Sequence, residues 1–231
     1  MITQSKQALS MLAKQIADSH RDELEQLKRE HEQLRRTDFV WHYLLQSFST
    51  MGRAAGWHGL IGNHENYAKV TYEALANLSP EARDRQVRET CRAAKIRMPG
   101  KKADFILGCF FLIKALGGPA EAKARQVRET GRDNKIRFLR QFPGIGPKYA
   151  RNMMMDVYHE DFRESIAIDV RIRAISVALG LSFSSYEEHE RFYLDAAAMV
   201  GLNGWEMDRL LFNYRDDFER AIASTRASAE S

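Results

Sequence analysis

Two residues in this sequence, Lys148 and Asp169, have side chains suited to nucleophilic and acid–base chemistry. Lys148 follows Pro147, which suits the first position of a helix because its missing N–H would have no partner there. The dipole at a helix N-terminus disfavours a cation and so favours the neutral, nucleophilic amine. That preference matters because only about one lysine amine in a few thousand is neutral at pH 7. A carboxylate such as that of Asp169 could take up a proton or stabilise developing positive charge.

The turn before Lys148 is suited to a sharp chain reversal and to anion binding. Gly144 and Gly146 permit the positive φ angles that other residues resist, so we expect a helix-hairpin-helix over residues 134–158. The N–H groups at such a turn and helix start favour phosphate. From Lys123 to Arg151 there are nine basic and two acidic residues, which predicts a cationic surface for a polyanion. The candidate residues for binding phosphates of such a polyanion are Gly144, Gly146, Lys135, Arg137, Arg140 and Arg151.

Asp169 ends the short apolar segment Ser165–Ile168, and we expect a helix over residues 170–179 to follow it, ended by Gly180. Aspartate is among the preferred N-cap residues, so a purely structural role for Asp169 is an alternative to a catalytic one. The two roles are compatible, because a carboxylate held by backbone N–H groups is fixed in place.

The sequence Phe142–Ala150, with Asp169 and Val170 downstream, resembles the helix-hairpin-helix DNA glycosylase superfamily, which includes endonuclease III and 8-oxoguanine DNA glycosylase. A Lys-Ala pair before the hairpin and the closing stretch Asp208–Leu211 are similar as well. In the bifunctional members the motif lysine attacks the sugar and the aspartate assists. Lys148 and Asp169 occupy those two positions.

This resemblance implies a bifunctional DNA glycosylase and AP lyase of base-excision DNA repair. The expected partner is double-stranded DNA with a damaged or abasic nucleotide, and the preferred lesion is an oxidised purine such as 8-oxoguanine. The enzyme would form a Schiff base through Lys148 and nick the strand by β-elimination. A glycosylase for oxidised pyrimidine or uracil, and a non-catalytic helix-hairpin-helix DNA-binding protein, remain alternatives.

The resemblance also implies further binding residues. Members of the superfamily often hold K⁺, Na⁺ or Ca²⁺ on backbone carbonyls of the hairpin, here those of Arg140, Phe142 and Ile145, and require no other cofactor. Gln46 or Phe48 would contact DNA by filling the gap left by an extruded base; alternatively, these two residues only end a helix.

The cysteine count and the hydropathy pattern restrict the possible cofactors and the cellular location. Cys91 and Cys109 are too few for a four-cysteine iron–sulfur cluster, so we expect none. The longest apolar run, Phe105–Ile113, is too short to span a bilayer, and Met1–Lys14 has no apolar signal core. We therefore expect a soluble intracellular monomer with no membrane association, located in the cytoplasm at the nucleoid or in a nucleus.

The predicted fold class is all-α, with two helical lobes and the helix-hairpin-helix at the cleft between them. One lobe would comprise residues 37–165, and the other residues 1–36 plus 166–231. The following local elements are expected: one long helix over 1–36, a helix over 39–48 capped by Thr37 and Asp38, a loop over 56–64, a helix beginning at Ser79–Pro80, a helix over 104–116 and a frayed tail after 221.

One internal repeat stands out. Residues 85–97 match residues 125–137 at ten of thirteen positions, and both copies are strongly basic. Each copy could face phosphate or form a solvated helix face. We favour phosphate contact for the second copy, because it leads into the hairpin.

Overall fold

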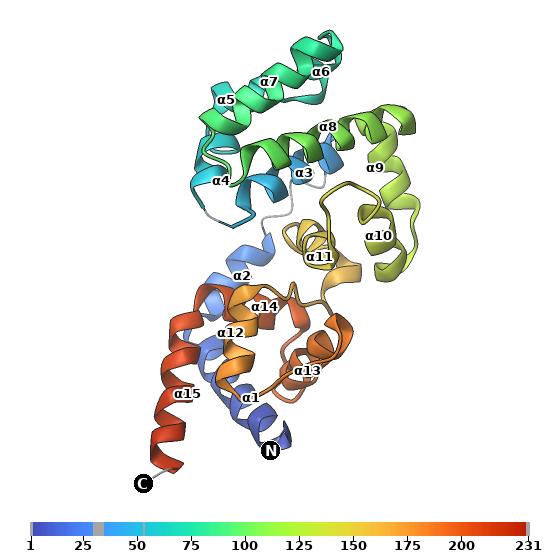
Figure 1. The fold of residues 1–231 in the computed structure, drawn as a ribbon. Coiled ribbons are helices and arrows are strands. Elements are labelled where there is room, and N and C mark those ends of the chain that lie inside the picture. The colour runs from blue at the N-terminus through green and yellow to red at the C-terminus, as the bar shows by residue number, and fades with distance from the viewer. Residues whose placement is uncertain (1, 30–34, 53, 230–231) are drawn as a thin grey trace. The chain divides into compact units, whose positions relative to one another are not determined.

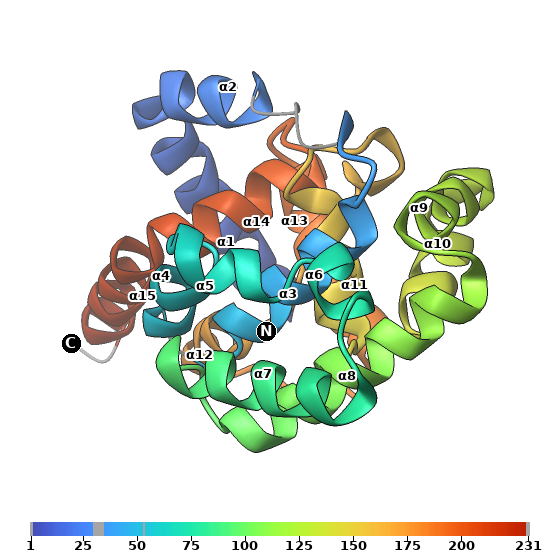
Figure 2. The same cartoon turned by 90° about the horizontal axis from the view of Figure 1, so that it is seen from above.

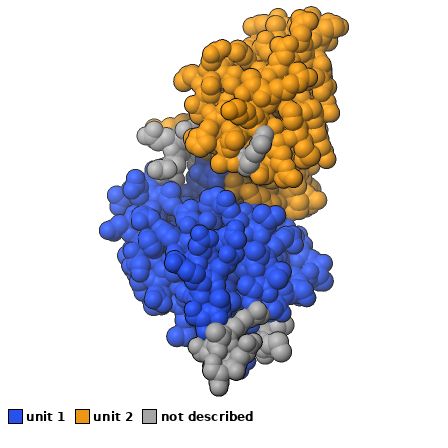
Figure 3. Space-filling model, turned by 60° about the vertical axis from the view of Figure 1, so that its left-hand side comes forward, with its two compact units in different colours: residues 1–31, 154–231 blue, residues 32–153 orange. Residues whose placement is uncertain are grey.

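The computed structural model describes residues 2–29, 35–52 and 54–229, and every regular element in these ranges is helical (Figure 1). The predicted all-α fold class is therefore confirmed. The chain forms two compact units: unit 1 contains residues 1–31 and 154–231, and unit 2 contains residues 32–153 (Figure 3). The boundaries expected from the sequence lie at residues 36 and 165.

Unit 2 is built around α3 (Phe39–Thr50), whose aromatic and aliphatic side chains form much of its core. Trp41 is fully buried and donates its indole N–H to the carbonyl oxygen of Val70 at 3.0 Å. Helix α8 packs against both α3 and α7 (Figure 2). The other helices of this unit are α4 (Ala55–Leu60), α5 (His64–Lys69), α6 (Tyr72–Ala76), α7 (Pro80–Ala93), α8 (Pro99–Leu116), α9 (Pro119–Arg128), α10 (Gly131–Leu139) and most of α11 (Pro147–Met155).

Unit 1 packs α1 against α13 and α14, and α12 against α14 and α15. Its elements are α1 (Ile2–Ser19), α2 (Arg21–Arg29), a 3₁₀ turn (Glu160–Phe162), α12 (Val170–Ala178), α13 (Tyr186–Ala198), α14 (Gly204–Asn213) and α15 (Arg215–Ala229). The end of α11 belongs to this unit because Trp205 donates its indole N–H to Met155 O at 2.7 Å and Arg209 pairs with Asp156 at 3.0 Å.

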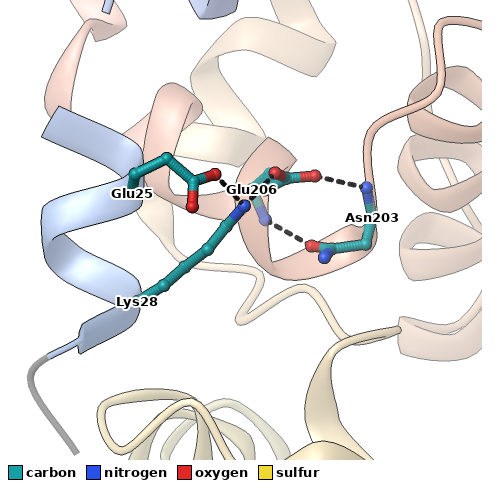
Figure 4. Close-up of polar contacts among 4 residues, drawn as sticks. All are labelled: Glu25, Lys28, Asn203 and Glu206. Carbon is teal, nitrogen blue, oxygen red and sulfur yellow. Dashed lines mark hydrogen bonds and ion pairs between the residues drawn. The ribbon is translucent and has the colours of Figure 1, made fainter. Parts of the chain in front are cut away.

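An ion-pair cluster in unit 1 joins α2 to α14 (Figure 4). Asn203 and Glu206 form a capping box at the start of α14, each side chain accepting a backbone N–H of the other residue. The ammonium group of Lys28 reaches Glu206 at 2.7 Å and Glu25 at 2.6 Å. Both carboxylates hydrogen-bond to this amine and raise the pKa of Lys28, against the opposing effect of burial.

Several local predictions differ from the structure. The long helix expected over 1–36 stops at Ser19 and restarts at Arg21, where the apolar seam is interrupted at His20; residues 30–34 of that prediction lie outside the described ranges. Asp38 does not cap α3 with its side chain, because its carboxylate pairs with Arg36 at 2.9 Å. Helix α8 begins at Pro99 rather than at residue 104, and α15 continues to Ala229 where a frayed tail was expected.

The glycine-rich stretch 56–64, expected as a loop, instead contains α4 and the start of α5. Gly62 lies in the turn after α4, but Gly56 and Gly59 lie inside the helix and serve close packing. A Cβ added to Gly56 would stand 2.3 Å from Ser49 O, and one added to Gly59 would stand 2.1 Å from Ala94 O. Helix α4 can therefore approach its neighbours only because these two positions lack a side chain.

The internal repeat is not a structural repeat. Most of the first copy lies in α7, a single helix that ends at Ala93. The second copy is broken: α9 ends at Arg128 and α10 begins at Gly131, whose φ is +74°. Gly131 replaces Cys91 of the first copy, and only glycine adopts such a φ without strain.

In the described ranges, no single helix is both long and apolar enough to cross a membrane; α8 and α9 meet those criteria only when joined across a bend of 78°.

Candidate nucleic-acid interface and catalytic residues

Helices α10 and α11 are joined by a tight turn over residues 140–146, which is the expected hairpin. Ile145 N–H donates to Phe142 O at 3.1 Å and closes the turn. Phe142 is 1% exposed and Ile145 is 6% exposed, so both side chains anchor the turn in the core of unit 2. Ala150 N–H donates to Gly146 O at 3.0 Å, which begins the hydrogen bonding of α11. The buried side chains of Phe142 and Ile145 thus hold the turn in place on the core of unit 2.

The two glycines of the turn have different roles. Gly144 has φ +82°, and a Cβ added there would stand 2.4 Å from Cδ2 of Phe105. Glycine is therefore required at position 144 for two reasons: the positive φ angle and the close packing of the Phe105 ring. Gly146 lies outside the left-handed range, and a Cβ added there would meet no atom within 4 Å. The space beside Gly146 is open, which leaves the start of α11 accessible to an anion.

Lys148 lies at the second position of α11 and is half-buried. Its Nζ stands 4.2 Å from the centroid of the Tyr149 ring. An amine over an aromatic face is held in a restricted set of positions. The structure therefore places this amine at the N-terminal end of α11, one residue after Pro147.

The four basic residues proposed from the sequence to contact phosphate divide into two pairs. Arg137 and Arg140 are exposed, and Arg137 donates to the side chain of Asn134 at 2.9 Å. Lys135 is 5% exposed and donates to Glu129 O, while Arg151 is 3% exposed and donates to Pro147 O at 3.1 Å. Backbone carbonyls thus bind the heads of these two buried cations, and of the four residues only Arg137 and Arg140 present their charge at the surface.

Gln46 and Phe48, the two candidates for filling a gap in DNA, both lie inside α3. Phe48 is fully buried and its ring centroid stands 5.8 Å from that of Phe105. This placement favours the structural interpretation of Phe48, since a residue inserted into a base stack must reach the surface. Gln46 is half-buried.

Asp169 is the N-cap of α12, as the sequence predicted. Its Oδ1 accepts the backbone N–H of Arg171 at 2.8 Å and that of Ile172 at 3.1 Å. The residue is half-buried and belongs to unit 1, whereas Lys148 belongs to unit 2. The two hydrogen bonds use one carboxylate oxygen and fix the orientation of the group.

Sequence reasoning missed the side chains that surround the segment before Asp169. Glu190, Asp208 and Tyr186 bind the backbone N–H groups of Ile166, Ala167 and Ile168. The spacing of Tyr186 and Glu190, four residues apart in one helix, could have indicated a shared face.

A second buried amine was also missed. Lys102, near the start of α8, is 4% exposed, and its Nζ stands 2.6 Å from Sδ of Met51 and 5.4 Å from the Phe105 ring centroid. Burial, followed by the charges of Lys101 and Arg97, lowers the pKa of Lys102. Lys102 is therefore a buried lysine that loses its proton more readily than an exposed lysine does.

Histidines and acids give no metal centre in the described part of the chain, where no group of three or more His, Cys, Asp or Glu residues could hold an ion. His42 contacts Tyr67 Oη through its Nδ1 at 2.8 Å, and burial lowers the pKa of His42 to about 4. This pair supports the core of unit 2.

Comparison with known proteins shows a fold but no sequence relative. No protein-family model and no curated protein matches the chain. Among solved structures, the 8-oxoguanine DNA glycosylase of Thermotoga maritima is 17% identical, has a TM-score of 0.64, and the match covers 90% of this chain and 95% of that one. The chain has the fold of the 8-oxoguanine DNA glycosylases. The resemblance seen in the hairpin sequence is thereby confirmed at the level of fold.

Two structures from Methanocaldococcus jannaschii show the same likeness. Its 8-oxoguanine DNA glycosylase is 16% identical with a TM-score of 0.64, covering 89% of this chain and 92% of that chain. Its 8-oxoguanine glycosylase/lyase, in complex with a 15mer DNA containing 8-oxoguanine, is 16% identical with a TM-score of 0.63, covering 89% and 97%.

Proposed function

We propose that this protein is a DNA glycosylase with AP-lyase activity, which removes an oxidised purine such as 8-oxoguanine from double-stranded DNA. The observation that carries the proposal is a lysine amine at the N-terminal end of α11, beside an open glycine turn, in a chain with the 8-oxoguanine glycosylase fold. One of the similar structures is named a glycosylase/lyase and holds DNA containing 8-oxoguanine.

In the proposed reaction the neutral amine of Lys148 attacks C1′ of the damaged nucleotide. The N-glycosidic bond breaks, and the base leaves with its bonding electron pair and takes up a proton. Ring opening gives a Schiff base between Lys148 and C1′. Loss of a proton from C2′ then breaks the C3′–O bond, which is β-elimination, and water releases the lysine. Because a base inside a duplex cannot be reached, the nucleotide must first be extruded.

Asp169 would take the proton that Lys148 loses or stabilise positive charge on the sugar. Its fixed N-cap geometry supports this role, since a catalytic group gains from pre-set orientation. The mechanism requires the Lys148 amine and the Asp169 carboxylate to reach the same deoxyribose.

DNA would be bound through its phosphates at the hairpin. The N-terminus of α11 and the exposed Arg137 and Arg140 provide positive charge, and a phosphate would approach beside Gly146, where an added Cβ meets no atom within 4 Å. The carbonyls of Arg140, Phe142 and Ile145 would hold K⁺, Na⁺ or Ca²⁺, which prefer oxygen ligands. The Phe142 carbonyl fits this role although it accepts the Ile145 N–H, because a carbonyl oxygen has two lone pairs. A bound ion would add positive charge for phosphate binding.

A panel of duplexes, each with one modified base, tests this proposal. We expect excision and strand nicking on 8-oxoguanine, and a covalent adduct when borohydride is present. The Lys148→Gln variant should lose both nicking and adduct, whereas Lys114→Gln, a change at an exposed position at the end of α8, should keep them. Activity on oxidised pyrimidine or uracil alone would redirect the substrate assignment. DNA binding with no excision on any lesion would favour the non-catalytic alternative.

A further inference from the structure

The segment Ser165–Ile168, directly before Asp169, belongs to no helix or strand, yet its residues are 0–4% exposed. Buried backbone N–H groups need partners, and this segment has no neighbouring strand to supply them. Only one hydrogen bond within the segment is formed, from Ile168 N–H to Ile166 O at 3.1 Å. Side chains bind the N–H groups of Ile166, Ala167 and Ile168.

Three side chains from α13 and α14 bind successive N–H groups of this segment. Their acceptor atoms are Glu190 Oε1 for Ile166 N–H at 3.0 Å, Asp208 Oδ1 for Ala167 N–H at 2.7 Å, and Tyr186 Oη for Ile168 N–H at 2.9 Å. The Tyr186 hydroxyl also donates to Ile166 O at 2.8 Å. We call Tyr186, Glu190 and Asp208 the cradle.

Two members of the cradle are buried acids, Glu190 at 2% and Asp208 at 4% exposure. Burying a carboxylate is costly, and a neutral acceptor would satisfy an amide N–H. Hydrogen bonds to a charged acceptor are, however, about twice as strong as neutral ones. The arrangement thus fixes the backbone more firmly than satisfaction of its N–H groups requires. The guanidinium of Arg209, 4.0 Å from Asp208, compensates part of this charge.

The cradle fixes the chain on one side of Asp169, and α12 fixes it on the other through the two N-cap hydrogen bonds. The backbone of α14 adds a third constraint, because a Cβ on Gly204 would stand 2.7 Å from Ser165 N. We propose that Tyr186, Glu190 and Asp208 are positioning residues that set the Asp169 carboxylate for proton transfer at the sugar. This inference rests on the proposed function and adds residues that act through Asp169.

The first test is a single-turnover assay of Asp208→Asn, which keeps an acceptor oxygen but removes the charge. A misplaced catalytic group costs up to about 100-fold, so we expect the cleavage rate to fall by roughly 10-fold or more. The dissociation constant for a duplex with an uncleavable abasic analogue should stay within about twofold of wild type, because the cradle acts on the backbone before Asp169 rather than on phosphate. An equal loss in binding, or an unchanged rate, would overturn the proposal.

A double variant separates positioning from general stabilisation. Effects of residues that act through one another are not additive. In an Asp169→Asn background, Asp208→Asn should therefore slow cleavage by less than about twofold further. A merely structural role would slow both backgrounds equally. If Asp208→Asn lowers the melting temperature, Tyr186→Phe, which removes one hydroxyl, replaces it in the same cycle.

Glu206→Gln is the matched control. It neutralises another carboxylate of α14 that accepts a backbone N–H, but it acts on Asn203 and Lys28 rather than on the segment before Asp169 (Figure 4). We expect this variant to lose stability and to keep the wild-type cleavage rate when folded. A rate loss equal to that of Asp208→Asn would contradict a role specific to the cradle.

Amide hydrogen exchange gives a readout independent of activity. The N–H groups of Ile166 and Ala167 should exchange faster in Asp208→Asn, and those of α12 should not change until global unfolding. Unchanged exchange rates in the segment would refute the claim that the cradle holds its backbone, even if the enzyme is active. An inactive wild-type protein would instead refute the proposed function, while exchange would still decide whether the cradle holds the segment.

Discussion

An alanine at Gly144 should lower the free energy of unfolding, whereas an alanine at Gly146 should leave it unchanged or raise it slightly. In Gly144→Ala the new side chain would occupy φ +82°, which costs about 1–2 kcal/mol. It would also meet three atoms of the Phe105 ring at 2.4–2.8 Å, and overpacking of this kind costs about 1–3 kcal/mol. Alanine also makes the unfolded chain less flexible, which stabilises the folded state by about 0.4–1 kcal/mol and offsets a small part of these two costs. The expected loss of unfolding free energy is therefore about 1–5 kcal/mol.

Gly146→Ala meets neither obstacle, because it lies outside the left-handed range and finds no atom within 4 Å. Its stability should stay within about 1 kcal/mol of wild type, with a gain from reduced unfolded-state freedom. Its methyl group would, however, stand where a phosphate is proposed to approach. We therefore expect weaker binding of duplex DNA by this variant, although it is fully folded.

Urea denaturation followed by circular dichroism gives both stabilities, and fluorescence anisotropy with a labelled duplex gives both affinities. Stable Gly144→Ala protein would refute the packing account of this turn. Unchanged DNA affinity in Gly146→Ala would refute the proposal that phosphate approaches beside Gly146.

Three further predictions concern unit 1. Asp169→Ala should lose about 1 kcal/mol of stability and nearly all nicking activity. Asp169→Asn should keep most of the stability, because an asparagine still caps α12. Thermal melts and nicking assays check both variants. Gly204→Ala should disturb Ser165, since its Cβ would stand 2.7 Å from Ser165 N, and a lower melting temperature would be measured by calorimetry. Burial lowers the pKa of His189 from 6.5 to about 4, so the unfolded chain binds the proton more tightly and stability should fall by up to roughly 3 kcal/mol as pH drops from 6.5 to 4. Urea midpoints across this range should vary less in His189→Gln.

Local signals in the sequence predicted those elements whose form depends on neighbouring residues in the chain. Ser79 and Pro80 start α7 as expected, with the serine side chain accepting the N–H of Ala82. Asp169 caps α12, and Gly180 follows that helix with φ +73°. Each of these elements depends on a hydrogen bond or a φ angle set by residues adjacent in the chain, so the residue types alone predict it.

Features that depend on tertiary partners were not predictable in the same way. Gly56 and Gly59 resemble turn residues until the carbonyls that they pack against are known. Lys135 and Arg151 resemble surface cations, but carbonyls of Glu129 and Pro147 bind them inside unit 2. Glu190 and Asp208 resemble solvated helix residues, because the segment that they bind lies far from them in sequence. In each case the deciding contact comes from elsewhere in the fold.

Mass-spectrometric mapping of the borohydride-trapped adduct tests the central claim most directly. The protein is reacted with duplex DNA containing 8-oxoguanine in the presence of borohydride, digested, and sequenced for the modified lysine. The proposed mechanism predicts a reduced sugar adduct on Lys148. An adduct on another lysine, such as the buried Lys102, or the absence of any adduct on lesion and abasic DNA, would contradict it.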